Sequence, residues 1–332
     1  MTAFGFMRWL LHAFHSSWWL TTVTTQGPLW LQGEAWRSQN ALLNLQRTPL
    51  KPTRLFLLTF LALIAFASNS LLCRLALKQT TIDAASFTFI RIFSGAAVLW
   101  LISRLRGTSL RHAGNWPSAL ALFTYAAAFS FAYLSLSAGT GALLLFGAVQ
   151  ATMICWGLRR GERLRALQLG GLILALSGLV TLLFPGLSAP PLTGSVLMLS
   201  AGAAWGVYSL RGKAAGDPVS ATAGNFLRAV PFAAVLAVTL VPSARLDRAG
   251  IAYAILSGAI ASGLGYVIWY TALPRLKAAS AATVQLSVPV LTAAGGILLL
   301  GEPLTLRFLI ASVAVLGGIT LVVITPCQSK SG

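Results

Sequence analysis

The sequence predicts an all-α polytopic membrane protein with ten transmembrane helices, arranged as two inverted five-helix repeats. Three observations lead to this fold class. Of the 332 residues, 57% are hydrophobic and only 9% are charged, whereas about 25% of the residues in an average soluble domain are charged. The apolar residues form long runs separated by short polar segments, and the two halves of the chain match each other in order.

The apolar runs have the length that a membrane-spanning helix needs, which is about 20 residues. Because lipid offers the backbone no hydrogen-bond partners, only helices or closed barrels span it, and these runs are too continuous for barrel strands. The connections between them are short, so consecutive helices must run antiparallel. The spans are expected near residues 55–73, 84–103, 116–136, 138–157, 167–184, 193–210, 219–241, 250–272, 278–300 and 308–325.

The basic residues predict the orientation of these helices. The N-terminal segment, the C-terminus and the loops on their side of the membrane hold 17 Lys and Arg residues, whereas the opposite loops hold five. Cytoplasmic loops of membrane proteins carry such an excess of positive charge. We therefore expect a multi-pass protein of the cytoplasmic (inner) membrane with both termini in the cytoplasm.

The chain divides into four parts on this interpretation. Residues 1–53 form an N-terminal extension that holds five of the ten tryptophans, and it is either poorly ordered or an interfacial helix, of which we favour the first. Residues 54–185 and 192–325 are the two five-helix repeats. Residues 326–332 are a short cytoplasmic tail.

The two repeats are recognised by four sequence matches in the same order. The clearest pairs "FIRIFSGAAVL" (89–99) with "FLRAVPFAAVL" (226–236), 137 positions later, and three further matches lie 140 positions apart. Each half contains five predicted helices, an odd number, so the second half enters the membrane from the opposite side. Inverted repeats of this kind are typical of transporters that work by alternating access.

These features resemble the EamA-like family of the drug/metabolite transporter superfamily over residues 54–325. The first predicted helix contains "FASN" (66–69), where the family often has Trp-x-x-Asn, and the sixth contains "WGVY" (205–208). The family's mid-helix proline corresponds to Pro289 in the ninth helix, but Val149 stands at the matching place in the fourth. The resemblance implies a secondary transporter of a small organic metabolite, and it implies export.

The polar residues argue against other functions. The carboxylates and histidines all lie outside the predicted spans, so no catalytic cluster can be assembled. The three cysteines have no metal-ligand spacing, and no basic helix or aromatic-basic module for nucleic acid is present. We expect no enzymatic activity, no cofactor and no metal. The expected partners are a small-molecule substrate and the lipid bilayer, with no nucleic acid, and the protein is expected to be a monomer or a weak homodimer. An intramembrane enzyme acting on a lipid or lipid-linked substrate and a non-transporting assembly protein are the alternatives.

Loop carboxylates are expected to have structural roles at helix N-termini, where an acidic group complements the helix dipole. Asp83 and Asp217 precede the second and seventh helices, and Glu162 and Glu302 precede the last helix of each half. With no carboxylate inside a span, the sequence predicts facilitated diffusion, exchange or a proton carried on the substrate, and not antiport gated by a carboxylate.

The candidate substrate-binding residues are the polar and aromatic side chains inside the spans. The amides among them either line the pathway or only tie helices together, and for Tyr125 and Tyr266 we favour packing. Arg91 and Arg228 lie at matching places in the two repeats, and for them a helix-bracing role and a substrate role are equally supported. The full set is Asn69, Arg91, Gln150, Trp205, Tyr208, Asn225, Arg228, Tyr270 and Gln285.

Overall fold

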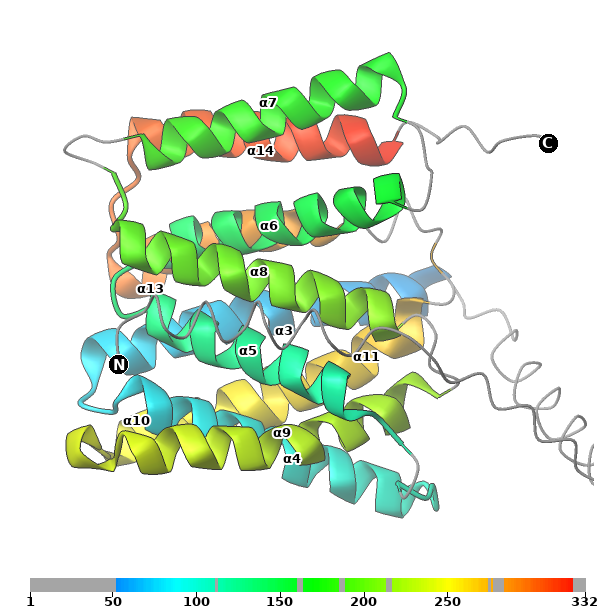
Figure 1. Ribbon diagram of the computed structural model, residues 1–332, viewed down its shortest axis with the longest axis vertical. Helices are drawn as coiled ribbons and strands as arrows, with labels where there is room; N and C mark the ends of the chain where they lie inside the picture. Colours follow the sequence, from blue (N-terminus) through cyan, green and yellow to red (C-terminus); the bar gives the residue numbers. More distant parts are fainter. Residues whose placement is uncertain are drawn as a thin grey trace, which may run out of the picture. The chain divides into compact units, whose positions relative to one another are not determined.

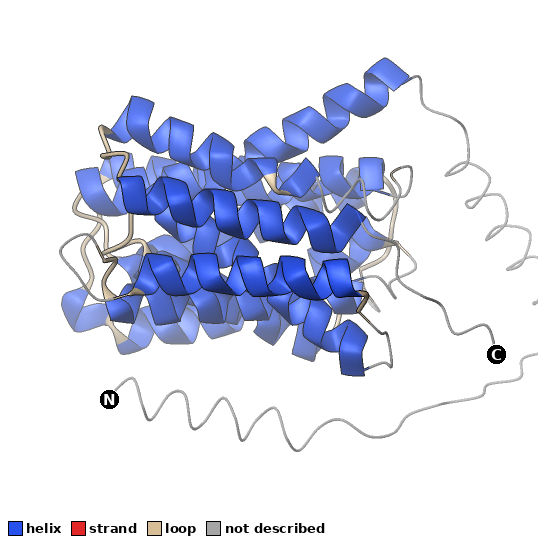
Figure 2. Ribbon diagram, turned by 90° about the horizontal axis from the view of Figure 1, so that it is seen from above, coloured by secondary structure: helices blue, strands red, loops and turns tan. Residues whose placement is uncertain are grey.

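The computed structural model describes residues 52–110, 113–159, 164–184, 189–212, 217–273, 276 and 284–324. The N-terminal extension up to residue 51, the C-terminal tail and Glu162 lie outside these residues. Within the described part of the chain all regular structure is helical, as Figures 1 and 2 show. These helices belong to one compact unit, Leu50–Gly332.

The helices follow the predicted order. They are α3 (Pro52–Gln79), α4 (Ala84–Leu105), α5 (Trp116–Ala132), α6 (Ala138–Arg159), α7 (Ala166–Leu183), α8 (Leu192–Gly212), α9 (Pro218–Thr239), the 3₁₀ turn η1 (Val241–Ser243), α10 (Arg248–Ile255), the π-helical segment η2 (Leu256–Leu264), α11 (Gly265–Ala272), α13 (Ser287–Leu300) and α14 (Leu306–Ile324). Of the helical stretches in the described residues, seven are long and apolar enough to cross a membrane, and α5 and α13 are apolar but shorter. A helical membrane protein is thereby confirmed, while the count of ten spans stays a prediction.

Acidic and amide side chains set several helix starts. Asp83 accepts hydrogen bonds from the backbone N–H groups of residues 85 and 86 and so caps α4. Asp217 does the same for α9, and Asn115 caps α5. Each satisfies backbone donors that the first turn of a helix leaves without partners. The predicted structural roles of Asp83 and Asp217 are therefore confirmed.

Some helix limits differ from the predicted ones. Helix α3 continues to Gln79, beyond the apolar run, because Arg74 and Lys78 find partners at other helix ends. The ninth predicted span is interrupted by a turn at Leu286, and α13 begins at Ser287. Pro289 therefore lies in the first turn of α13 and not in mid-helix. Its missing N–H costs nothing at this position, since the first turn has no intrahelical acceptor for that group.

Helices from the two halves pack against each other along their lengths. Helix α4 packs on α9, α6 on α13, and α7 on α14, and in Figure 1 these pairs run side by side. Glycines allow close approach, as at Gly202 and Gly206 on α8. A Cβ added to Gly202 would lie 2.5 Å from the Leu145 carbonyl oxygen of α6, which is closer than real side chains come.

The stretch from α10 through η2 to α11 is one continuous helix with a nine-residue π-helical middle. Such segments are rare and are often found at functional sites. Segment η2 packs against α3 and α4. Gly258 lies so close to the Arg91 carbonyl oxygen that a side chain would collide with it. This contact places Ser257 of η2 at the centre of the bundle, beside the polar residues of α3 and α4.

Candidate functional site

A chain of hydrogen bonds links four buried polar residues at the centre of the bundle. The Arg91 Nη2 of α4 donates to the Tyr125 hydroxyl oxygen of α5 at 3.0 Å. Asn69 Nδ2 of α3 donates to the same oxygen at 3.1 Å. The Ser257 hydroxyl of η2 donates to Asn69 Oδ1 at 2.7 Å. The network thus ties α3, α4, α5 and η2 together in a region shielded from solvent.

No carboxylate among the described residues pairs with the positive charge of Arg91. Its side chain is almost completely buried, with 2% of the residue exposed. Its Cζ lies 5.2 Å and 4.8 Å from the ring centroids of Tyr125 and Phe129, and aromatic faces attract cations. Among the described residues, Nη1 has no hydrogen-bond partner. A buried charge with a free donor is costly, so this arginine is ready to accept an additional partner.

A small cavity lies next to this network. Its volume is about 20 Å³, which is room for about one water molecule. The helices are therefore closed around the centre in this conformation. Its walls come from both halves of the chain: Phe66, Asn69, Ser70, Tyr125, Phe129, Leu145, Phe146, Trp205, Ala261, Tyr266 and Gln285.

Aromatic rings form a large part of the cavity wall. The Trp205 ring centroid lies 4.9 Å from that of Tyr125 and 5.1 Å from that of Tyr266. Phe66 meets Tyr266 edge to face at 6.0 Å. Rings at these separations stabilise one another, and they present faces that can receive an apolar group or a cation.

The predicted candidates divide between the cavity and its surroundings. Asn69, Trp205 and Gln285 line the cavity, and Arg91 lies directly behind Tyr125. Tyr208 stacks on Trp205 at 5.4 Å, one layer further out. Gln150 and Tyr270 belong to helices of the site but are not among the residues that line the cavity.

Sequence reasoning gave no site role to two lining tyrosines. Tyr125 and Tyr266 were expected to serve packing, yet both border the cavity, and Tyr125 is the centre of the polar network. A signal was present in the sequence, because these tyrosines lie 141 positions apart, close to the repeat offset. The phenolic groups thus occur at matching places in the two halves.

Asn225 and Arg228 lie at a different place. Arg228 Nη1 donates to the backbone oxygens of Ala113 and Gly224, and Asn225 Oδ1 accepts from the Asn115 backbone N–H at 2.8 Å. Both side chains fasten α9 to the segment that precedes α5. The contacts of Arg228 in the described chain are those of a brace, whereas Asn225 also hydrogen-bonds the side chain of Tyr208.

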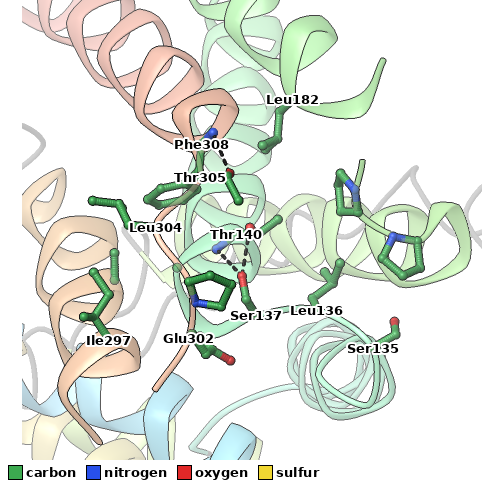
Figure 3. Close-up of a pocket in the computed structure, with 15 residues that line it drawn as sticks. Ser135, Leu136, Ser137, Thr140, Leu182, Ile297, Glu302, Leu304, Thr305 and Phe308 are labelled. Carbon is green, nitrogen blue, oxygen red and sulfur yellow. Dashed lines mark hydrogen bonds between the residues drawn. The ribbon is translucent and has the colours of Figure 1, made fainter. Parts of the chain in front are cut away.

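A larger pocket of about 190 Å³ lies at one end of the bundle, where the loops before α6, α8 and α14 meet. Figure 3 shows it, with Ser137, Thr140 and Glu302 on its wall. We refer to this end, which holds residues 80–83, 133–137 and 301–305, as the Glu302 end. The pocket offers hydroxyl groups but no unpaired charge, since the Glu302 carboxylate is already used.

Glu302 has a structural role, as predicted, but at another helix. Its Oε1 accepts from Arg74 Nε at 3.0 Å, and its Oε2 accepts from the Ala138 backbone N–H at 2.7 Å. The carboxylate therefore caps α6 and not α14. Gly301 has φ 63°, which turns the chain sharply after α13 and directs Glu302 back into the bundle.

At the same end, two aspartates join the loop before α4 to the loop before α10. Asp83 Oδ2 accepts from the Arg245 backbone N–H at 2.9 Å, and Asp247 Oδ2 accepts from the Thr81 backbone N–H at 2.7 Å. Hydrogen bonds from the Gly250 and Thr81 backbone lower the pKa of Asp247 to about 2. Partial burial opposes the shift at Asp83, but backbone hydrogen bonds, including that from Arg245, outweigh it and lower its pKa. We call this pair of contacts the aspartate clasp.

The described residues contain no group of three or more His, Cys, Asp or Glu side chains that could hold a metal ion. The chemistry that this site offers is that of recognition: one buried cation, hydroxyl and amide groups, and aromatic faces around a closed cavity. Polar groups placed in a mainly apolar and aromatic cavity are typical of sites that bind small molecules.

Known proteins resemble this chain in sequence and in fold. Residues 192–324 match the model of the EamA-like transporter family. An uncharacterized protein of Pseudomonas aeruginosa is 60% identical over 270 residues, covering 81% of this chain and 94% of that protein. The threonine/homoserine exporter RhtA of Salmonella typhimurium is 38% identical over 141 residues, covering 40% of this chain and 46% of the exporter. One crystal structure shares the fold with a TM-score of 0.60 at 20% identity, covering 80% of this chain and 98% of that one.

Proposed function

The chain belongs to the EamA-like transporter family, and on this premise we propose that it exports a small organic solute across the cytoplasmic membrane by alternating access. The observation that carries the proposal is the closed central cavity with Tyr125 and Asn69 at its wall and the buried Arg91 hydrogen-bonded to Tyr125. Ionisable groups inside a membrane protein are costly and usually mark a solute pathway. The family is one of transporters and not of enzymes.

The arrangement of the cavity supports the inverted repeats that alternating access uses. Three pairs of lining residues stand 139 to 141 positions apart in the sequence: Phe66 with Trp205, Leu145 with Gln285, and Tyr125 with Tyr266. The helix contacts agree, because α5 packs on α8 as α11 packs on α3, and α6 packs on α8 as α13 packs on α3. A site shared by two such halves opens to either side when one half rocks against the other.

Export is supported by the relative RhtA, whose name states export of threonine and homoserine. Since the match covers less than half of each chain, we carry over the direction and the general size of the solute, not its identity. The charge bias supports cytoplasmic termini, and this orientation assigns the Glu302 end to the outside. The pocket of about 190 Å³ at that end is a suitable exit.

We further propose transport without a titrating carboxylate. The described Asp and Glu residues lie at helix ends, where Glu302 is paired with Arg74 and the three aspartates cap helices. Facilitated diffusion, exchange or a proton carried on the solute then accounts for coupling. In liposomes, a pH gradient alone should not drive uphill accumulation of a solute without a titratable group, and strong accumulation would contradict this part of the proposal.

The function itself is tested with a deletion strain and an overexpressing strain. Both are exposed to amino acids, amines and nucleoside-like solutes, and intracellular and extracellular amounts are measured. We expect the overexpressing strain to tolerate and release at least one of these solutes better than the parent, and the deletion strain to retain it. Equal retention and release by all three strains for every class of solute would contradict the proposal.

A further inference from the structure

We propose that the transported solute carries a carboxylate, which binds in the central cavity to the hydroxyl group of Tyr125 with the Arg91 guanidinium directly behind it. This inference rests on the transport function proposed above and names the class of solute. Three features of the described residues support it: the direction of one proton, the balance of one charge and the fixed position of one amide.

The first feature is the Tyr125 hydroxyl proton. A phenolic oxygen can accept hydrogen bonds and has one proton to donate. Here Arg91 Nη2 and Asn69 Nδ2 both donate to this oxygen, at 3.0 Å and 3.1 Å. The proton must therefore point to a third partner, and no described residue accepts it. Because Tyr125 lines the cavity, a hydrogen-bond acceptor in the cavity is the partner that this geometry favours.

The second feature is the unbalanced charge. Arg91 is 2% exposed, its Nη1 has no partner among the described residues, and the nearest elements contribute hydroxyl, amide and aromatic groups. A buried charge is tolerated when an opposite charge accompanies it. One guanidinium balances one negative charge, so a carboxylate fits better than a phosphate, which carries up to two at neutral pH.

The third feature is that the donors are already in place. Ser257 donates to Asn69 Oδ1 at 2.7 Å, which leaves Asn69 Nδ2 turned toward Tyr125. Trp205 packs against the Tyr125 ring at 4.9 Å and fixes its plane. Groups that need no rearrangement lose less entropy when a ligand binds. The aromatic faces around these donors provide a surface on which the apolar part or the ammonium group of the solute can pack.

The experiment compares each amino acid with an isostere in which an uncharged carboxamide replaces the carboxylate. Purified protein in liposomes is supplied with neutral aliphatic L-amino acids and with the corresponding L-amino acid carboxamides, and counterflow is measured. The carboxamide keeps the shape and lacks the negative charge. We expect the wild-type protein to carry the amino acids at least about tenfold faster than their carboxamides, because a hydrogen bond to a charged group contributes about 1.5–3 kcal/mol.

Two variants and a control locate the carboxylate. Tyr125→Phe removes one hydroxyl and keeps the ring against Trp205, and Arg91→Gln removes the charge. Both should bring the acid-to-amide ratio close to one. Arg228→Gln is the matched control, because that arginine bonds backbone oxygens of the brace, and it should keep the wild-type ratio. If Arg91→Gln fails to fold, the acid-to-amide ratio of Tyr125→Phe alone tests the proposal.

The outcomes separate this inference from the function beneath it. Equal transport of acids and amides by the wild-type protein would overturn the carboxylate and leave transport standing. A wild-type ratio in Tyr125→Phe would also overturn the inference, because the carboxylate would then bind elsewhere. No flux of any panel member through correctly folded protein, together with equal release by the strains described above, would remove the proposed function and this inference with it.

Discussion

Arg91 and Arg228 occupy matching places in the two halves of the chain, yet their surroundings differ. Both precede the same four letters, Ala-Ala-Val-Leu, at the same distance. Arg228 is half-buried and donates to backbone oxygens of Ala113 and Gly224. Arg91 is buried and donates to the side chain of Tyr125 beside the cavity. A repeated residue type in a repeated register therefore does not imply a repeated role.

The difference arises from what each arginine meets. In front of Arg228 the backbone before α5 approaches so closely that Gly224 has no room for a side chain, and this approach supplies carbonyl oxygens. Arg91 instead meets α5, whose Tyr125 hydroxyl accepts its hydrogen bond. The same hydroxyl accepts from Asn69, which in turn accepts from Ser257 of the π-helical segment η2. Arg228 therefore has the main-chain partners of a brace, whereas Arg91 has a side-chain partner at the cavity wall, which is the basis of the recognition role proposed for it.

The largest expected effect separates the two arginines directly. Arg91→Gln should lower transport per molecule about 100-fold or more, because removing one partner of a buried charged contact costs about 2–5 kcal/mol. Arg228→Gln should lower the amount of folded protein more than the flux per molecule. Flux in liposomes, divided by the amount of protein reconstituted, measures both. Equal losses of flux per molecule in the two variants would mean that the arginines share one role.

The next effect concerns the glycines beside each arginine. Gly258→Ala would force a side chain into the Arg91 carbonyl oxygen, and Gly224→Ala would force one into Ala113. Each should lower stability by about 1–3 kcal/mol, as overpacking does. Gly170→Ala is the matched control, since nothing lies within 4 Å of its added Cβ. Thermal unfolding in detergent measures all three, and unchanged stability in Gly258→Ala would contradict the close packing of η2 on α4.

A third arginine, which does have a carboxylate partner, gives a smaller effect. Glu302→Gln removes the ion pair with Arg74 and weakens the cap on α6. We expect a loss of about 1–3 kcal/mol in unfolding free energy, because both groups are largely buried, and little change in the acid-to-amide ratio. Thermal unfolding and the transport assay together check this. A changed ratio would place Glu302 in solute recognition.

The smallest effect concerns the aspartate clasp, which holds the start of α4 near the loop before α10. The pKa of Asp247 is lowered to about 2 in the folded protein, against about 3.9 in an unfolded chain. A lowered pKa contributes stability above the unfolded value, and this contribution is lost as pH falls through the folded value. The melting temperature should therefore fall less between pH 4 and pH 2 in Asp247→Asn than in the wild type. Identical pH profiles would show that the clasp does not contribute.

The helices and their order could be predicted because the hydropathy of one segment is a local property. The run 250–272, for example, was expected as a helix and is found as one from Arg248 to Ala272. Its π-helical middle could not be predicted, since π turns leave no distinct apolar period over nine residues. Helix α13 also begins later than its apolar run suggests, at Ser287.

The site was only partly predictable for a related reason. Arg91 and Asn69 could be predicted as site residues because a strongly polar side chain inside a membrane span is unusual, whichever direction it faces. The residue type alone does not select Tyr125, because tyrosine is ordinary both in packed interiors and at membrane interfaces, and only its spacing of 141 positions from Tyr266 marks it. Glu302 was assigned to a helix start, but the helix it caps follows residue 137, far from it in sequence.

By itself, the sequence determined that this protein is a helical membrane protein of the EamA-like kind and that two arginines lie inside its apolar runs. Only the tertiary structure decided which arginine bonds to a residue of the cavity wall and which serves as a brace. The reason is that the partners come from distant segments: Tyr125 lies 34 positions from Arg91, and Ser257 lies 188 from Asn69. Helical periodicity assigns a residue to a face, but the helix that covers this face is set by packing between segments far apart in the chain.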